Sequence, residues 1–376
     1  MMNRSRCLPT LRLGAAIAAA ALAAGCTTAP RPADAPERPA DVRQRVQSLL
    51  PPALADRAGW AQDLQVAFSA LGVEPSVENL CAAIAVAEQE SGLRADPPVP
   101  RLGEIARREL EERAERAGVP RLAVAAALVL PSPDGRSWNE RLAAVKTERE
   151  LSELYESFID RVPLGRRFLA SRNPVRTGGP MQVSVAFAER QAERGYPYPL
   201  KGSVRDEVFT RRGGLYFGVA HLLDYEAPYD ALIYRYADFN AGRWASRNAA
   251  FQNALAAVTG IPLVPDGDLL PPDAGRDTPP GATETAARSL ASRLGLDADD
   301  IRRELAQGEG PGFERSRLWQ RVFALAERQG RTLPRAALPR ITLEGPKIQR
   351  KLTTEWFARR VDERQRRCVA RADSPA

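Results

Sequence analysis

Apolar residues recur every three or four positions along most of the chain, which is the period of an amphipathic helix. Proline, glycine and capping residues interrupt this pattern and mark the helix ends. Strand-like alternation is short: residues 182–187, QVSVAF, alternate but equally suit the start of a helix. The pattern therefore predicts a mainly α fold, with helices over residues 41–50, 58–71, 76–91, 102–117, 120–130, 137–159, 181–194, 203–224, 229–240, 243–258, 283–294, 297–307, 313–329 and 346–371.

Two proline-rich stretches break the helical pattern and divide the chain into regions. Residues 26–40 have no apolar period and indicate a flexible tether. Residues 262–282 form a second linker rich in Pro, Gly and Asp. Residues 41–261 are therefore predicted to form one large helical domain, and residues 283–376 a C-terminal helical region.

The first 25 residues have the features of an export signal. Basic residues precede an apolar stretch, LGAAIAAAALAAG, that is too short to span a bilayer. It ends in LAAGC, which resembles the signal of bacterial lipoproteins and implies that Cys26 is lipidated. Ala23 stands where those signals prefer Leu, so an ordinary secretory signal is the alternative. Thr27 resembles the pattern of lipoproteins sorted to the outer membrane, which implies an anchor on the periplasmic face of that membrane in a Gram-negative bacterium.

Composition adds three constraints to this picture. With 44% apolar and 27% charged residues, the chain is typical of globular proteins. A net charge of +7 suits an anionic polymer or an ordinary solvated surface, and no nucleic-acid-binding motif is present. In an exported protein Cys81 and Cys368 either pair as a disulfide or remain buried free thiols.

The chain contains a single histidine, His221, within a helical stretch. It also lacks CxxC, HExxH and GxxxxGK[ST] motifs. Metal-dependent hydrolases and His-dependent triads need at least one well-placed histidine, so both classes are disfavoured. We expect no metal or cofactor, and His221 is interpreted as structural.

Glu90 occupies an unusual place near the end of the helix predicted over residues 76–91. It lies on the apolar face with Ala87, whereas Glu88 lies off that face and is interpreted as a surface charge. A carboxyl group on a buried face, near the negative end of a helix, keeps its proton to higher pH. That property suits the general acid of glycosidic bond cleavage. The alternative is that the helix frays at Glu90 and the carboxylate points to water.

Two later stretches give Glu90 a context. Residues 173–189 read NPVRTGGPMQVSVAFAE, and residues 213–242 end in ADFNAG. In order, the chain shows Glu-Ser at a helix end, Gly-x-Met-Gln, and an aromatic residue followed by Asn-Ala-Gly. This order resembles the lysozyme-like lytic transglycosylases, the soluble and goose-type lysozyme group. The resemblance covers roughly residues 60–260, apart from a long insertion at about residues 93–172.

The resemblance implies a lysozyme-like domain that cleaves the β-1,4 bond between N-acetylmuramic acid and N-acetylglucosamine. Glu90 matches the catalytic acid/base, Met181 and Gln182 match the segment that lines the sugar groove, and Asn240 matches a polar contact near the reacting sugar. A single carboxylate then acts, the muramoyl 6-hydroxyl closes a 1,6-anhydro ring, and no cofactor is needed. The implied partners are peptidoglycan strands and a membrane through Cys26, with no nucleic acid.

The chain departs from the family pattern at three positions. Pro180 replaces the usual Leu, Asn173 stands where Ser is common, and Phe239 replaces a Tyr whose hydroxyl lies near the catalytic Glu in the family. Tyr236, one helical turn before Phe239, is the candidate to supply that hydroxyl. Phe239 favours a second interpretation, an envelope lipoprotein that binds glycan without cutting it. A muramidase that adds water to the same bond is the third.

Tyrosines cluster between residues 196 and 236. Sugars stack on aromatic rings and bond to hydroxyl groups, so Tyr196 and Tyr198 in the segment GYPYPLKG are the best groove candidates. The insertion is interpreted as packing around the groove, with a lid as the alternative. The basic C-terminal helix is interpreted as an amphipathic helix against the catalytic domain, with Trp356, Phe357 and Val361 inward.

Overall fold

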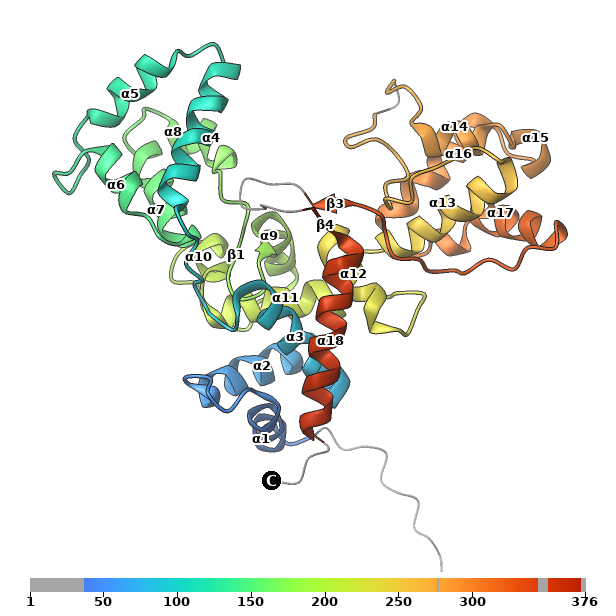
Figure 1. Ribbon diagram of the computed structural model, residues 1–376, viewed down its shortest axis with the longest axis horizontal. Helices are drawn as coiled ribbons and strands as arrows, with labels where there is room; N and C mark the ends of the chain where they lie inside the picture. Colours follow the sequence, from blue (N-terminus) through green and yellow to red (C-terminus); the bar gives the residue numbers. More distant parts are fainter. Residues whose placement is uncertain (1–36, 276, 344–350, 373–376) are drawn as a thin grey trace, which may run out of the picture. The chain divides into compact units, whose positions relative to one another are not determined.

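The computed structural model describes residues 37–275, 277–343 and 351–372, and Pro39–Ala376 forms one compact unit. The described residues contain eighteen α-helices and two short β-ribbons, so the protein is mainly α, as predicted (Figure 1). The predicted signal segment, Cys26 and residues 26–36 of the predicted tether lie outside the described residues. None of the described helices is both long enough and apolar enough to cross a membrane.

The first hydrophobic core combines helices from both ends of the chain. Its central helix is α3, on which every residue from 80 to 87 is buried. The C-terminal helix α18 packs against α3 and α12, with Phe357 and Val361 inward as predicted and Trp356 half-buried beside them. The helices of this core are α1 (Pro39–Leu49), α2 (Arg57–Leu71), α3 (Val77–Ser91), α9 (Val185–Arg194), α10 (Val204–Val208), α11 (Arg211–Leu223), α12 (Leu232–Ala241) and α18 (Thr354–Ala372).

Helix α18 is joined to α3 by a covalent bond and by charge. Cys81 and Cys368 form a disulfide, which is one of the two alternatives that the sequence left open. Arg364 and Arg367 of α18 lie 3.6 and 4.0 Å from the carboxylate of Glu88. Glu88 is thus a partly exposed charge that pairs with two arginines, a pairing that the sequence did not predict.

The second hydrophobic core lies within residues 245–333. Helix α13 belongs to it although α13 precedes the predicted linker, and α18 belongs to the first core although it follows the linker. The predicted boundary at 261–262 therefore does not separate the two cores. The helices of the second core are α13 (Ala245–Thr259), α14 (Ala282–Arg288), α15 (Ala291–Leu294), α16 (Ala298–Leu305) and α17 (Arg317–Arg328), with 3-10 turns at Ala306–Glu309 and Phe313–Arg315.

The predicted linker is held against α13 by one buried glutamine. Gln252 donates from Nε2 to Oδ1 of Asp266 at 2.7 Å and to the carbonyl of Asp268 at 3.1 Å. Its Oε1 accepts from the backbone N–H of Gly267 at 2.8 Å. Side-chain bonds of this kind replace the backbone ladder that a loop lacks. Residues 266–268 are therefore part of the second core's surface.

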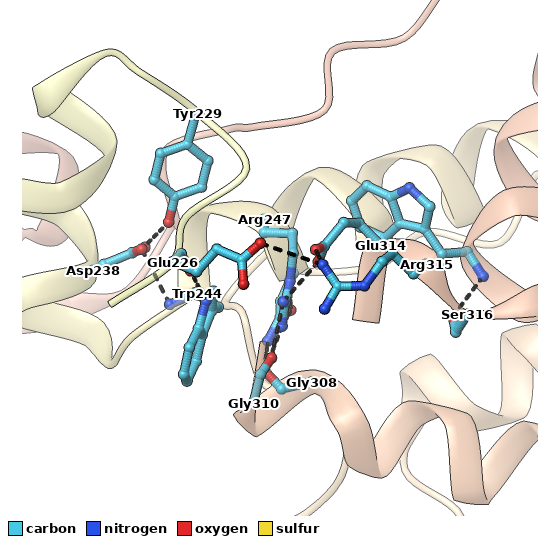
Figure 2. Close-up of polar contacts among 12 residues, drawn as sticks. Glu226, Tyr229, Asp238, Trp244, Arg247, Gly308, Gly310, Glu314, Arg315 and Ser316 are labelled. Carbon is cyan, nitrogen blue, oxygen red and sulfur yellow. Dashed lines mark hydrogen bonds and ion pairs between the residues drawn. The ribbon is translucent and has the colours of Figure 1, made fainter. Parts of the chain in front are cut away.

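Arg247 anchors a second loop to α13. Its side chain is fully buried, and its guanidinium donates to the carbonyls of Gly308 at 2.7 Å and Gly310 at 3.0 Å. It also bonds to the carboxylate of Glu314 at 3.0 Å. Figure 2 shows these three acceptors converging on the guanidinium. The loop around residues 308–314 is therefore pinned to the start of α13.

Arg247→Met tests the importance of this anchor. Methionine fills a similar volume but leaves the Gly310 carbonyl without its donor, and leaves the Gly308 carbonyl only Asn248 and the Glu314 carboxylate only Arg315. Breaking a buried pair is costly. We expect the free energy of unfolding to fall by about 3 kcal/mol, measured by urea denaturation. Arg303→Met is the control, because its side chain is 63% exposed and we expect its loss to change stability by less than about 0.5 kcal/mol. Equal effects of the two substitutions would contradict the role given to Arg247.

The insertion has a small core of its own. Its apolar residues pack together and also against Val175 and Phe209, which lie outside the insertion. The insertion therefore packs on the rest of the chain through these two residues, and none of its described residues lines the cleft described below. Its elements are α4 (Leu102–Arg116), α5 (Arg121–Val129), α6 (Trp138–Ala144), α7 (Glu148–Ile159), α8 (Gly165–Leu169) and the 3-10 turn Ala170–Arg172.

Three predicted helices begin late or divide because of a capping side chain. The predicted helix 137–159 divides where Thr147 caps α7 with a capping box, and 203–224 divides where Thr210 caps α11. The ambiguous segment QVSVAF holds a strand and a helix start, since Ser184 caps α9. The strands are β1 (Thr177–Gly178) paired antiparallel with β2 (Val183–Ser184), and β3 (Thr342–Leu343) paired antiparallel with β4 (Leu352–Thr353).

Candidate functional site

Glu90 lies in the last turn of a well-ordered helix. Helix α3 continues through Ser91, whose hydroxyl donates to the carbonyl of Ala87 at 2.8 Å and accepts from the backbone N–H of Arg94 at 3.1 Å. Gly92 then ends the helix in the left-handed conformation, with φ of 62°, which glycine adopts without steric cost. The alternative of a helix frayed at Glu90 was therefore wrong. In the Glu-Ser pair, Glu90 is the candidate site residue and Ser91 secures the end of the helix that carries it.

A cleft of about 880 Å³ brings together the three stretches that the sequence singled out. Glu90 lines it from α3, Gln182 from the loop between β1 and β2, and Asn240 from α12. The complete lining is Glu90, Thr177, Gln182, Val183, Ser184, Phe187, Arg190, Gln191, Arg194, His221, Phe239, Asn240, Ala241, Gly242, Arg243, Trp244, Ala245, Asn248, Gly267, Asp268, Gly308 and Glu309. Residues far apart in the chain thus share one concave surface, which is where small-molecule and polymer ligands bind.

The environment of Glu90 favours its protonated form. The side chain is half-buried and makes no hydrogen bond or ion pair with another described residue. Burial raises the pKa of the carboxyl to about 8, and the negative charge of Glu148 acts in the same direction. Glu148 is buried at the start of α7, in the insertion, and does not line the cleft. The chemical result is a carboxylic acid that still holds its proton at neutral pH.

Gln182 is oriented by an unusual backbone. Its φ is 50°, which is rare for a residue with a side chain, and Gly179 just before it has φ of 73°. A Cβ at Gly179 would lie 2.1 Å from the carbonyl of Val208, so the turn requires glycine. The amide oxygen of Gln182 accepts from the hydroxyl of Thr177 at 3.3 Å. The tight turn thus presents the Gln182 amide to the cleft.

Asn240 is oriented from the C-terminal helix. Its Oδ1 accepts a hydrogen bond from the hydroxyl of Thr354, the first residue of α18, at 2.8 Å. The bond occupies the amide oxygen and leaves the amide N–H groups as the donors that Asn240 offers to a ligand. The far end of the chain therefore helps to build the cleft.

Two predicted groove residues lie in the core instead. Met181 is fully buried against Gly218, where an added Cβ would lie 2.3 Å from the methionine sulfur. Tyr236 is also fully buried, and its hydroxyl has no hydrogen-bond partner among the described residues. Neither lines the cleft, because both side chains point from their elements into the first core. Tyr236 is thus no substitute for the hydroxyl that Phe239 lacks.

The two tyrosines predicted for sugar stacking also lie elsewhere. Tyr196 lines a second hollow of about 400 Å³, which shares Gln191 and Arg194 with the cleft. Its hydroxyl donates to the carboxylate of Glu207 at 2.7 Å. Tyr198 lines neither hollow and lies under the guanidinium of Arg212, 4.7 Å from the ring centroid. Local loop sequence did not reveal which way these rings turn.

His221, which was predicted to be only structural, lines the cleft. Its ring lies 4.7 Å from the ring of Phe187 and 5.0 Å from that of Phe239, between centroids, and Nε2 is 3.3 Å from the carbonyl of Phe239. Burial, followed by the charge of Arg243, lowers the pKa of the imidazole to about 4. His221 is therefore neutral at physiological pH and helps to fix the position of Phe239.

Other lining residues escaped the sequence analysis. On α9, Phe187, Arg190 and Arg194 follow each other at helical spacing and so share one face, a signal that was visible in the sequence. Another part of the lining comes from the second core and includes Asp268 and Glu309. That part depends on the contacts of Arg247 and Gln252, which no local pattern reveals.

Across the described ranges, no group of three or more His, Cys, Asp or Glu side chains is arranged to hold a metal ion. The polar groups that line the cleft include amides, hydroxyls, arginines and carboxyl groups.

Comparison with known proteins places the chain in a family. Residues 53–371 match the family described as "Protein of unknown function (DUF1615)". The chain belongs to this family. It is also 50% identical over 370 residues to the protein called "Uncharacterized protein YaiW" of Escherichia coli (strain K12). The aligned residues cover 98% of this chain and 100% of that protein. No solved structure matches the chain.

Proposed function

We propose that the protein is a lysozyme-like lytic transglycosylase that cleaves the β-1,4 bond between N-acetylmuramic acid and N-acetylglucosamine in peptidoglycan. The observation that carries the proposal is the position of Glu90. Its carboxyl group, with a pKa of about 8, lines the same cleft as Gln182 and Asn240. These are the positions at which the chain resembles the lytic transglycosylases.

The proposed reaction uses one carboxyl group twice. Protonated Glu90 donates its proton to the glycosidic oxygen, the bond from that oxygen to C1 of the muramoyl sugar breaks, and the N-acetylglucosamine hydroxyl leaves. The N-acetyl group of the substrate stabilises the positive charge at C1. The Glu90 carboxylate then takes the proton of the muramoyl 6-hydroxyl, whose oxygen bonds to C1. The 1,6-anhydro ring closes, Glu90 is protonated again, and no water is consumed.

The neighbours of Glu90 support this role. Asn240 lines the cleft, and because Thr354 bonds to its amide oxygen, its N–H groups remain to bind a carbonyl or hydroxyl oxygen of the sugar. Phe187 and Phe239 provide apolar rings in the same cleft, which suit the C–H faces of a sugar. The proposed location is the periplasmic face of the outer membrane, with the anchor at Cys26.

A second candidate function is glycan binding without cleavage. Phe239 lines the cleft at the position where the lytic transglycosylases carry a tyrosine, and Tyr236 does not replace the missing hydroxyl. A lipoprotein of this kind would retain strands in the cleft and release no product. A muramidase would use the same Glu90 proton and differ only in adding water at C1.

Digestion of purified peptidoglycan sacculi distinguishes the three functions. We expect the protein to release muropeptides with 1,6-anhydro ends. Mass spectrometry identifies these products, because each is 18 mass units, the mass of about one water, lighter than the hydrolysed product. Reducing ends would show a muramidase. Cosedimentation with sacculi and no released product would show a binding protein. If the protein neither binds sacculi nor releases product, all three functions are contradicted.

The activity should depend on pH through the pKa of Glu90. The acid form starts the reaction, so the rate should stay level below about pH 8 and fall about tenfold per pH unit above it. Glu148→Gln removes a negative charge that raises this pKa, so the fall should then begin at lower pH. Rates of sacculus solubilisation between pH 5 and 10 test both statements. A fall that starts near the ordinary carboxyl pKa of 4.5 would contradict the acid role of Glu90.

A further inference from the structure

One part of the cleft lining carries arginines that form no ion pair with a described carboxylate. Arg190 and Arg194 are exposed on α9, and neither side chain has a hydrogen bond or ion pair with another described residue. Arg243 lines the cleft beside them and donates only to the carbonyls of Ala220 and His221. Burial lowers the pKa of Arg243 to about 10, and the positive charge of Arg194 acts in the same direction, whereas the negative charge of Asp224 acts against it.

The part of the lining that comes from the second core carries the reverse charge. Asp268 and Glu309 line the cleft from the second core, and both are exposed. Neither carboxylate has an ion pair with a described residue. Burial and the negative charges of Asp266 and Glu309 raise the pKa of Asp268, so the acids also repel one another. The cleft is therefore positive on the α9 side and negative on the side of the second core.

Like charges that repel within a folded protein lower its stability, and a ligand of opposite charge relieves the repulsion. A glycan strand without peptides offers one carboxylate on each muramoyl lactyl group and no amino group. A strand with its stem peptides offers several carboxylates and the free amino group of a diamino acid. Arginine suits the carboxylates, because its planar guanidinium binds them with two hydrogen bonds.

We propose that the cleft selects peptidoglycan that still carries its stem peptides. Arg190 and Arg194 bind the stem carboxylates, and Asp268 and Glu309 bind the free amino group of the stem. This inference rests on the proposed function, since it names the form of peptidoglycan that the same cleft takes. It distinguishes the substrate from strands whose stems an amidase has removed.

Binding to three soluble ligands tests the inference, with the full chain carrying Glu90→Gln so that no ligand is cut. The ligands are glycan fragments with tetrapeptide stems, the same fragments after amidase treatment, and stem-bearing fragments with acetylated amino groups. We expect the stem-bearing fragment to bind about tenfold more tightly than the amidase-treated one, as a few exposed charge contacts imply. The difference should shrink at high salt.

Two double variants assign the difference to the two walls. Arg190→Gln with Arg194→Gln should remove the preference for stems, whereas Asp268→Asn with Glu309→Gln should weaken binding only to the fragment with free amino groups. Arg108→Gln with Arg116→Gln is the control, because these exposed arginines lie on α4 outside the cleft. We expect the control to keep the preference.

The outcomes separate this inference from the proposed function. Equal binding of stem-bearing and amidase-treated fragments would overturn the inference and leave the glycosidic activity standing. A preference that survives loss of both α9 arginines would also overturn it. Failure to bind any of the three fragments, together with no release from sacculi by the unsubstituted protein, would contradict the proposed function itself.

Discussion

Glu90→Gln is expected to reduce the release of muropeptides from sacculi by at least about 1,000-fold, the contribution typical of a general acid that also acts as base. Glutamine keeps the size of the side chain but has no proton to donate at any working pH. Glu88→Gln is the matched control on the same helix. Glu88 faces Arg364 and Arg367 and does not line the cleft. Because half-exposed ion pairs contribute little, we expect the Glu88→Gln protein to keep its activity within about threefold.

Stability separates loss of chemistry from loss of folding in this variant. The pKa of Glu90 is about 8 in the folded protein against 4.5 ordinarily, so between these values the unfolded chain releases a proton that the folded chain keeps. Stability therefore falls as pH rises through this window, and an uncharged glutamine removes the penalty. We expect Glu90→Gln to raise the free energy of unfolding at pH 7 by roughly 2 kcal/mol, measured by urea denaturation. An inactive but less stable variant would point to damage of the fold.

The sequence predicted those site residues whose position follows from a helix. Glu90 lies on the apolar face of α3, and the helical spacing alone placed it toward the interior. The packing of α3 and α18 then brings the Thr354 end of α18 to Asn240. The mainly α fold was equally visible, because amphipathic periodicity is a local property of the chain.

The sequence did not predict residues whose orientation depends on loops or distant contacts. Met181 and Tyr236 turn into the first core. Tyr196 donates a hydrogen bond to Glu207, Tyr198 lies under the guanidinium of Arg212, and neither ring lines the cleft. A motif gives the identity of a residue but not its rotamer or its neighbours. The wall formed by the second core is the clearest case: Figure 2 shows its loop held by Arg247, whose acceptors lie some 60 residues away in the chain.

The disulfide between Cys81 and Cys368 closes a loop of 287 residues, and its removal should have the largest effect on stability. A cross-link restricts the unfolded chain, and the loss grows with the length of the loop. We expect Cys81→Ala with Cys368→Ala to lower the free energy of unfolding by about 4 kcal/mol, measured by urea denaturation. Dithiothreitol should destabilise the unsubstituted protein by a similar amount and leave the double variant unchanged. Equal stability of both proteins without reductant would contradict this expectation.

The same substitution tests how the disulfide supports the cleft. Cys81 lies on the helix that carries Glu90, and Cys368 lies on the helix whose first residue, Thr354, bonds to Asn240. We expect the packing of these helices to persist without the disulfide, because Phe357 and Val361 are buried in the first core beside α3. We therefore expect the double variant to keep its activity at 25 °C within a few-fold and to lose it at a lower temperature than the unsubstituted protein. Complete loss at 25 °C with intact helical circular dichroism would instead show that the cross-link itself positions Glu90 and Asn240.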